Sequence, residues 1–66
     1  MNVGRSINVA LAKKDMSRTD LAQAMGTTNQ NIYYLIKSGK ASSETMKRLA
    51  DAFSLPVSEF IKLGED

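Results

Sequence analysis

The sequence contains no cysteine and no histidine, and only one proline. Without cysteine the chain has no disulfide, and without cysteine or histidine it lacks the usual ligands of zinc. The same absences remove catalytic triads, thiol chemistry and imidazole general bases, which would leave an enzyme with scattered carboxylates and hydroxyls. We therefore expect a protein that is not an enzyme and that carries no metal and no cofactor.

Long apolar runs are also missing, so no segment approaches the roughly 20 residues that a membrane-spanning helix needs. The amino terminus lacks the apolar block of a secretory signal. Charged residues make up 24% of the chain, which is ordinary for a soluble domain. We expect a soluble, cytoplasmic protein with no membrane partner.

The chain has 66 residues, enough for one domain and too few for a second. A chain of this size buries only about 60% of its unfolded surface. Because no disulfide or metal supports that small core, the core must consist of compact helix-on-helix packing. We predict a single domain over residues 1–66.

The net charge of +2 is unevenly distributed along the chain. Residues 1–48 hold eight bases and three acids, whereas residues 49–66 hold one base and four acids. The first three quarters of the chain could therefore face a polyanion. Charge alone supports equally well the interpretation that these are solubilising side chains on helix surfaces.

Helix-breaking residues and polar clusters divide the chain into about five short pieces, within which apolar residues recur every three or four positions. This spacing predicts an all-α protein, a compact five-helix bundle held together mainly by packing, because helices this short are marginal alone. The expected helices run from Val3 to Lys14, from the cap Ser17 to Gly26, from the cap Thr28 to Gly39, from Ser42 or Ser43 through Phe53, and onward from Pro56.

The second and third of these helices have the spacing of a helix-turn-helix. Ala22 is small where a following helix that crosses steeply needs close approach, and Gly26 can adopt the positive φ of a tight corner. Many two-helix hairpins are purely structural, but this combination of residues favours DNA binding. The motif comprises Leu21, Ala22, Met25, Gly26, Ile32 and Leu35.

The third helix is predicted to have a core face and an open face. At about 100° per residue, Ile32 and Leu35 share one side, whereas Gln30 and Tyr34 lie near the opposite pole. An Asn or Gln amide can pair with adenine, and the first residues of a recognition helix lie nearest the base edges. Gln30 is thus the first candidate for base readout, joined by Asn29 and Tyr34.

The two adjacent tyrosines cannot both be buried on one helix face, so at least one must be exposed. Tyr34 lies on the groove-facing side, where its hydroxyl can donate to a phosphate or a base edge. For Tyr33, a half-buried position against Lys40 or the fourth helix is the preferred interpretation.

Phosphate contacts are expected from the elements that flank the recognition helix, because backbone N–H groups at helix starts bind phosphate and fix register without reading sequence. Arg18 and Lys40 are the strongest candidates. The full set is Ser17, Arg18, Asn31 and Lys40. For five further bases the preferred interpretation is a solvated side chain: Arg5, Lys13, Lys14, Lys47 and Arg48.

From about Val3 to Leu63 the sequence resembles the helix-turn-helix domain of lambdoid phage repressors and Cro proteins. The match is close in Asp20-Leu-Ala-Gln-Ala-Met-Gly-Thr-Thr-Asn-Gln-Asn-Ile, and the segment that begins at Leu49 looks like the family's fourth and fifth helices. The resemblance implies a lambda repressor-like five-helix fold, operator DNA as ligand and a dimer as the binding unit. It implies base contacts by Thr28, Asn29, Gln30 and Tyr34, and phosphate contacts near Arg18 and Lys40.

The sequence departs from this family at two places. Several relatives carry an ion pair between the first and third helices where this chain has Leu11 and Ile36. An apolar pair can replace a buried ion pair at little cost in stability, so we predict that Leu11 packs directly on Ile36. The second departure is Tyr34, where some members have an amide.

One recognition helix covers only a few base pairs, so useful specificity implies a dimer on two half-sites about 34 Å apart. We expect its interface among Leu55, Pro56, Val57 and Phe60, a small patch that suggests weak self-association completed on DNA. The chain ends soon after the fifth helix, so its expected size resembles that of Cro or of an isolated amino-terminal repressor domain.

The sequence therefore predicts a transcriptional regulator, a Cro-like phage or prophage repressor that binds operator DNA as a dimer through the major groove. No small-molecule ligand is expected. The alternative is a protein-interaction module on the same fold, such as an antitoxin or an adaptor that uses the third helix against a protein.

Overall fold

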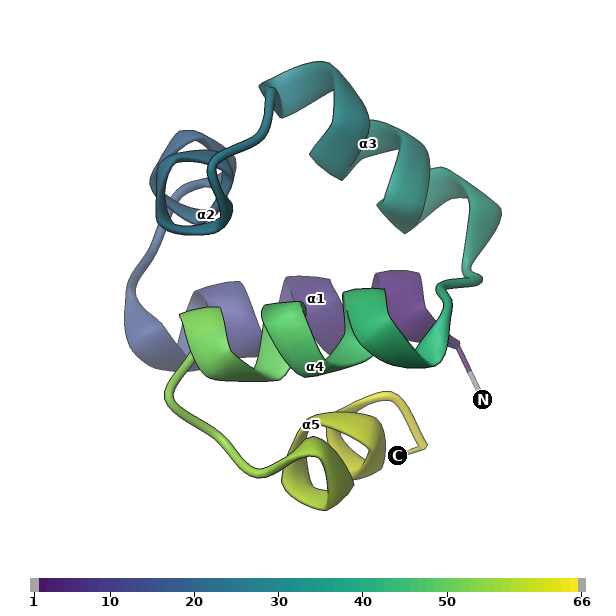
Figure 1. Ribbon diagram of the computed structural model, residues 1–66. Coiled ribbons are helices and arrows are strands. Elements are labelled where there is room, and N and C mark those ends of the chain that lie inside the picture. Colours follow the sequence, from purple (N-terminus) through teal and green to yellow (C-terminus); the bar gives the residue numbers. More distant parts are fainter. Residues whose placement is uncertain (1, 66) are drawn as a thin grey trace.

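The computed structural model describes residues 2–65, which form five helices and no strand (Figure 1). This confirms the predicted all-α, five-helix fold. No helix in this range is long and apolar enough to cross a bilayer. The helices are α1 (Val3–Lys14), α2 (Arg18–Met25), α3 (Asn29–Ser38), α4 (Ser43–Ala52) and α5 (Val57–Leu63).

Three of the helices begin at the side-chain caps that the sequence predicts. Ser17 Oγ accepts a hydrogen bond from the N–H of Asp20 at 3.0 Å, and the Asp20 carboxylate accepts one from the N–H of Ser17 at 3.0 Å. This reciprocal pair is a capping box at the start of α2. Thr28 caps α3, and Ser42 rather than Ser43 caps α4.

Helices α3 and α5 lie on opposite sides of the molecule, with α1 and α4 between them (Figure 1). Helix α1 packs against both α3 and α5, while α4 packs against α2 and α5. The buried side chains form one core. Its members are Val3, Ile7, Ala10, Leu11, Leu21, Ala22, Met25, Ile32, Leu35, Met46, Leu49, Ala50, Phe53 and Phe60.

The start of α1 is held against the end of α3. The side chain of Asn2 caps α1, and the N–H of Val3 donates to the carbonyl of Gly39 at 3.2 Å. Gly4 lies so close to Ile36 that a Cβ atom at this position would be 2.9 Å from its backbone carbonyl carbon. Helix α1 therefore fixes the carboxyl-terminal end of α3 through backbone contacts.

The predicted apolar replacement of an ion pair is consistent with this packing. Leu11 is buried in the core, and Ile36 is partly buried and packs against that core. A direct contact between these two side chains stays a prediction, because the close approach of α1 to Ile36 is made at Gly4.

Candidate nucleic-acid interface

The corner between α2 and α3 forms at the glycine that the sequence singles out. Gly26 adopts φ 68° and ψ 35°, in the left-handed region, which confirms the predicted positive φ. The N–H of Thr27 then donates to the carbonyl of Ala22 at 2.9 Å, so the chain turns back over the last turn of α2. An L side chain at Gly26 would be strained by the backbone conformation alone.

Arg48 of α4 supports this corner from outside the motif. Its Nη2 donates a hydrogen bond of 3.1 Å to the backbone carbonyl of Met25, at the last residue of α2. The carbonyls at the end of a helix lack intrahelical partners, so the guanidinium both satisfies one of them and complements the helix dipole. Arg48 is exposed, in line with the preferred interpretation of a solvated base, and its bond to Met25 is an additional contact that no spacing rule for residues 25 and 48 indicates.

Helix α3 has the two faces that its periodicity predicts. Ile32 and Leu35 are buried, whereas Asn29, Gln30 and Tyr34 are exposed. Tyr34 is 65% exposed and Tyr33 is 54% exposed, so neither tyrosine belongs to the core. The interpretation of Tyr33 as half-buried against Lys40 or the fourth helix stays a prediction, and α3 presents two aromatic side chains in addition to its amides.

Most of the predicted contact residues of α3 lie around one shallow depression. Thr28, Gln30, Asn31 and Tyr34 line it together with Thr27. The fifth predicted residue, Asn29, lies outside this set, on the side of α3 that faces α2.

Two of the three amides at the start of α3 are already held by the protein. Asn29 Nδ2 donates to Thr19 Oγ1 at 2.9 Å, and Asn31 Nδ2 donates to Thr27 Oγ1 at 2.9 Å. Within the described residues, Gln30 makes no side-chain hydrogen bond and keeps its full donor and acceptor capacity. The sequence did not predict that Thr19 accepts a hydrogen bond from Asn29, because nothing about a threonine in the first turn of a helix indicates a partner ten residues later in the chain.

Thr28 has a structural role in addition to its predicted contact with DNA. Its Oγ1 accepts from the N–H of Asn31 at 3.1 Å and so caps α3. A threonine hydroxyl can accept and donate at the same time, so the proton of this hydroxyl is still available to an outside acceptor.

The predicted phosphate-contacting residues differ in what they still offer. The capping box uses the N–H of Ser17 and its hydroxyl oxygen as an acceptor, which leaves the hydroxyl proton, and it places the Asp20 carboxylate at the start of α2. That negative charge opposes a phosphate at the same helix end. Arg18 and Lys40 are exposed and flank α3 on either side along the chain, so their charges are free to meet phosphates.

The predicted dimer patch is only partly at the surface. Pro56 is exposed, and Leu55 and Val57 are partly buried. Phe60 is 0% exposed and stacks on Phe53 with ring centroids 5.9 Å apart, so its inclusion in the interface is corrected. The helical spacing that groups Phe60 with Val57 marks the core face of α5.

The family model of the Cro/C1-type HTH DNA-binding domain matches residues 6–66. The match includes the corner at Gly26 and all of α3, which confirms the resemblance drawn from the sequence. No curated protein sequence matches the chain. The chain belongs to the Cro/C1-type helix-turn-helix family and is a DNA-binding domain.

Proposed function

We propose that this protein is a sequence-specific transcriptional regulator, a Cro-like phage or prophage repressor, which binds operator DNA as a dimer with α3 in the major groove. The observation that supports this proposal best is the outward face of α3. Gln30 and Tyr34 are exposed on a helix whose opposite side is anchored by Ile32 and Leu35. Such a helix presents side chains to base edges without moving its core contacts.

The hydrogen bonds at the start of α3 suggest what each amide reads. Gln30 is free to donate and accept together, as bidentate pairing with adenine N6 and N7 requires. Asn29 donates one amide hydrogen to Thr19 Oγ1, and its Oδ1 would then serve as the acceptor in a base contact. An acceptor selects a base with a major-groove donor, either adenine through N6 or cytosine through N4.

The flanking charges would set the register of the protein on the duplex. Arg18 at the start of α2 and Lys40 after α3 supply two phosphate contacts, and the remaining amide hydrogen of Asn31 supplies a third. Ser17 is the weakest member of the predicted set because Asp20 occupies its backbone N–H. These contacts raise affinity for every sequence alike.

The dimer would use the surface of Leu55, Pro56 and Val57, supported from beneath by Phe60. The patch is small, so we expect monomers in dilute solution and pairing on a palindromic duplex. Replacing Val57 with Glu should abolish cooperative binding to a two-half-site duplex while preserving binding to one half-site. Ser58→Glu adds the same charge one residue along and serves as the control.

Selection from random duplexes tests the proposal directly. The enriched sequence should be a palindrome with half-sites one helical turn apart, and log K should fall with log salt with a slope of about −4 to −5, as for about five phosphate contacts. No enriched motif, or binding to a protein with little salt dependence, would favour the interaction module instead.

Two variants separate readout from positioning in the same assay. Gln30→Ala should relax preference at one base position and cost roughly 1–3 kcal/mol on the selected site. Lys40→Ala should weaken selected and scrambled duplexes by similar factors. Lys62→Ala, on α5, is the matched control for loss of a lysine, and equal effects of the Gln30 and Lys40 variants on both duplexes would contradict the assignment.

A further inference from the structure

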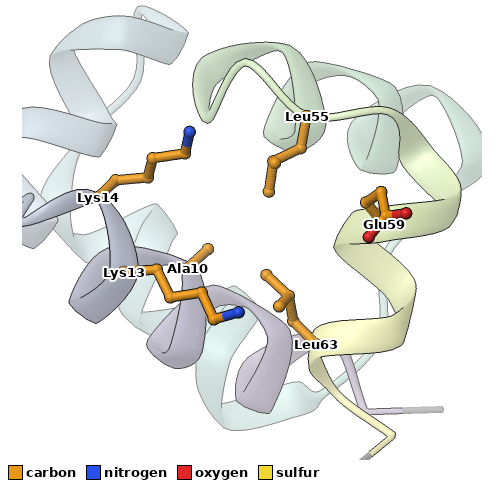
Figure 2. A pocket seen from close by; sticks show the side chains of 6 residues that line it. All are labelled: Ala10, Lys13, Lys14, Leu55, Glu59 and Leu63. Carbon is orange, nitrogen blue, oxygen red and sulfur yellow. The ribbon is translucent and has the colours of Figure 1, made fainter.

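A groove lies between the last turns of α1 and helix α5 (Figure 2). Its volume is about 300 Å³. Helix α5, which forms one wall of the groove, lies on the opposite side of the molecule from α3 (Figure 1). The lining residues are Ala10, Lys13, Lys14, Leu55, Glu59 and Leu63.

The groove combines an apolar floor with a charged rim. Ala10 is fully buried beneath it, and Leu55 and Leu63 are partly exposed. Figure 2 shows Lys13 and Lys14 on the α1 side and Glu59 on the α5 side, with the two leucines between them. The surface is therefore hydrophobic in the middle, positive along one edge and negative at the other.

The two lysines at the positive edge are stabilised by the end of α1 and can still bind carboxylates. Lys13 and Lys14 stand in the last turn of α1, where the helix dipole favours cations. Among residues 2–65, Glu59 on the far rim is the only acidic residue that lines the groove. The two ammonium groups are thus stabilised by the helix end, yet they remain available to carboxylates brought by another molecule.

We propose that this groove binds an acidic, amphipathic segment of another protein. Apolar side chains of the segment insert between Leu55 and Leu63, and its carboxylates lie on the α1 side against Lys13 and Lys14. Glu59 repels acidic residues from the opposite edge and so fixes the orientation of the segment. The segment thereby covers the apolar surface of the leucines and also pairs with the lysine charges. A DNA phosphate backbone could pair with the lysines but has no apolar groups to cover the leucines.

The position of the groove has a consequence for the assembly. Because α5 lies on the opposite side of the molecule from α3, the segment leaves α3 free for a DNA half-site. Leu55 belongs to both the groove and the proposed dimer patch, so the segment competes with the pairing of two copies but not with binding to one half-site. This consequence rests on the proposed function, whereas binding in the groove does not. The protein then acts as an adaptor that holds an acidic partner at the DNA site.

A peptide-display selection on the full chain tests the groove. We expect enriched peptides to carry two apolar residues at helical spacing beside at least two acids. Their affinity should fall roughly tenfold for the double variant Lys13→Glu/Lys14→Glu, the loss expected for two exposed ion pairs. Lys62→Glu makes the same charge change on α5 outside the groove and should alter affinity less than about twofold.

Two further measurements keep the result interpretable. The milder variant Lys13→Gln/Lys14→Gln should give an intermediate loss, and circular dichroism establishes that both double variants are folded. Amide chemical shifts on adding the selected peptide should change at Leu55 and Leu63 and stay unchanged at Gln30 and Tyr34. Selection should yield basic peptides when it is repeated on the double glutamate variant.

The proposal is overturned if selection enriches no peptide, if the enriched peptides lack acids, or if the double glutamate variant binds them as well as the unmodified chain does. Amide shifts at Glu59 and Leu63, outside the proposed dimer patch, that depend on protein concentration without peptide would identify a second copy of the chain as the occupant of the groove and overturn the proposal as well. A duplex with one half-site should bind with and without peptide at equal affinity, and competition would refute the adaptor role alone. Failure to select any duplex would refute the proposed function and the adaptor role that rests on it, and would leave binding in the groove unaffected.

Discussion

Gly4 offers the sharpest test of how α1 positions the recognition helix. A Cβ atom at Gly4 would overlap the backbone carbonyl oxygen of Ile36 and lie 3.1 Å from its Cα. The neighbour is backbone, so no side chain can rotate away, and α1 and α3 must move apart. Gly4→Ala should therefore destabilise the protein although alanine is the better helix former.

The magnitude follows from two opposing contributions. Replacing a helical glycine by alanine normally stabilises by about 0.5–1 kcal/mol. Forcing a methyl group into a filled contact typically costs about 1–3 kcal/mol. With a rigid neighbour the cost lies toward the upper end, so we expect a net loss of about 1–2 kcal/mol, which is a Tm drop of about 4–16 °C for a domain of this size.

Thermal and urea unfolding followed by circular dichroism measure this loss. Asn8→Ala is the control, because Asn8 is exposed on the same helix and its replacement should change Tm slightly and upward. The folded Gly4→Ala protein should also bind the selected duplex less tightly, since the end of α3 is displaced. A Gly4→Ala protein as stable as the unmodified one would refute the tight approach of α1 to Ile36.

The remaining predictions concern the corner and the amides. Gly26→Val should lower stability by about 1–2 kcal/mol or more in thermal unfolding, because the left-handed backbone disfavours an L side chain, whereas Gly26→Asn should be milder. Arg48→Met should cost about 1 kcal/mol in urea unfolding through the lost bond to α2, with Lys47→Met as a near-neutral control. Thr19→Val should leave stability within about 0.5 kcal/mol yet relax base preference beside Asn29, as read by duplex selection; unchanged preference would contradict the orienting role of Thr19.

Local patterns in the sequence were enough to predict the helices and the corner. The caps Ser17 and Thr28 act within four residues of their own positions, and the positive φ of Gly26 follows from its place between two amphipathic segments. The faces of α3 follow from periodicity in the same way. Each of these features is decided by interactions over about one helical turn.

Contacts between distant residues were beyond the sequence patterns. The bond from Arg48 to Met25 joins two helices across the fold, and nothing in the spacing of either residue indicates it. Phe60 was wrongly assigned to the dimer interface because α5 has only seven residues. In so short a helix, the spacing of apolar residues does not distinguish a face that packs on the core from a face that binds a partner. Only the arrangement of α4 and α5 shows that Phe60 stacks on Phe53.

On the proposed function, the contacts that α3 makes with α1 and α2 would influence how well it discriminates bases. A recognition helix gains specificity when its position is fixed before binding, because less ordering is required on the DNA. The start of α3 is held by Asn29 on Thr19, and its other end lies against Gly4. Gln30 is the amide left unconstrained between these supports. The amide of Gln30 can rotate and so can adapt to different bases after the protein has docked on DNA. The amide of Asn29 is restricted by its bond to Thr19. We therefore expect Asn29 to contribute more to base discrimination per contact, and Gln30 to contribute more to tolerance of neighbouring sequence.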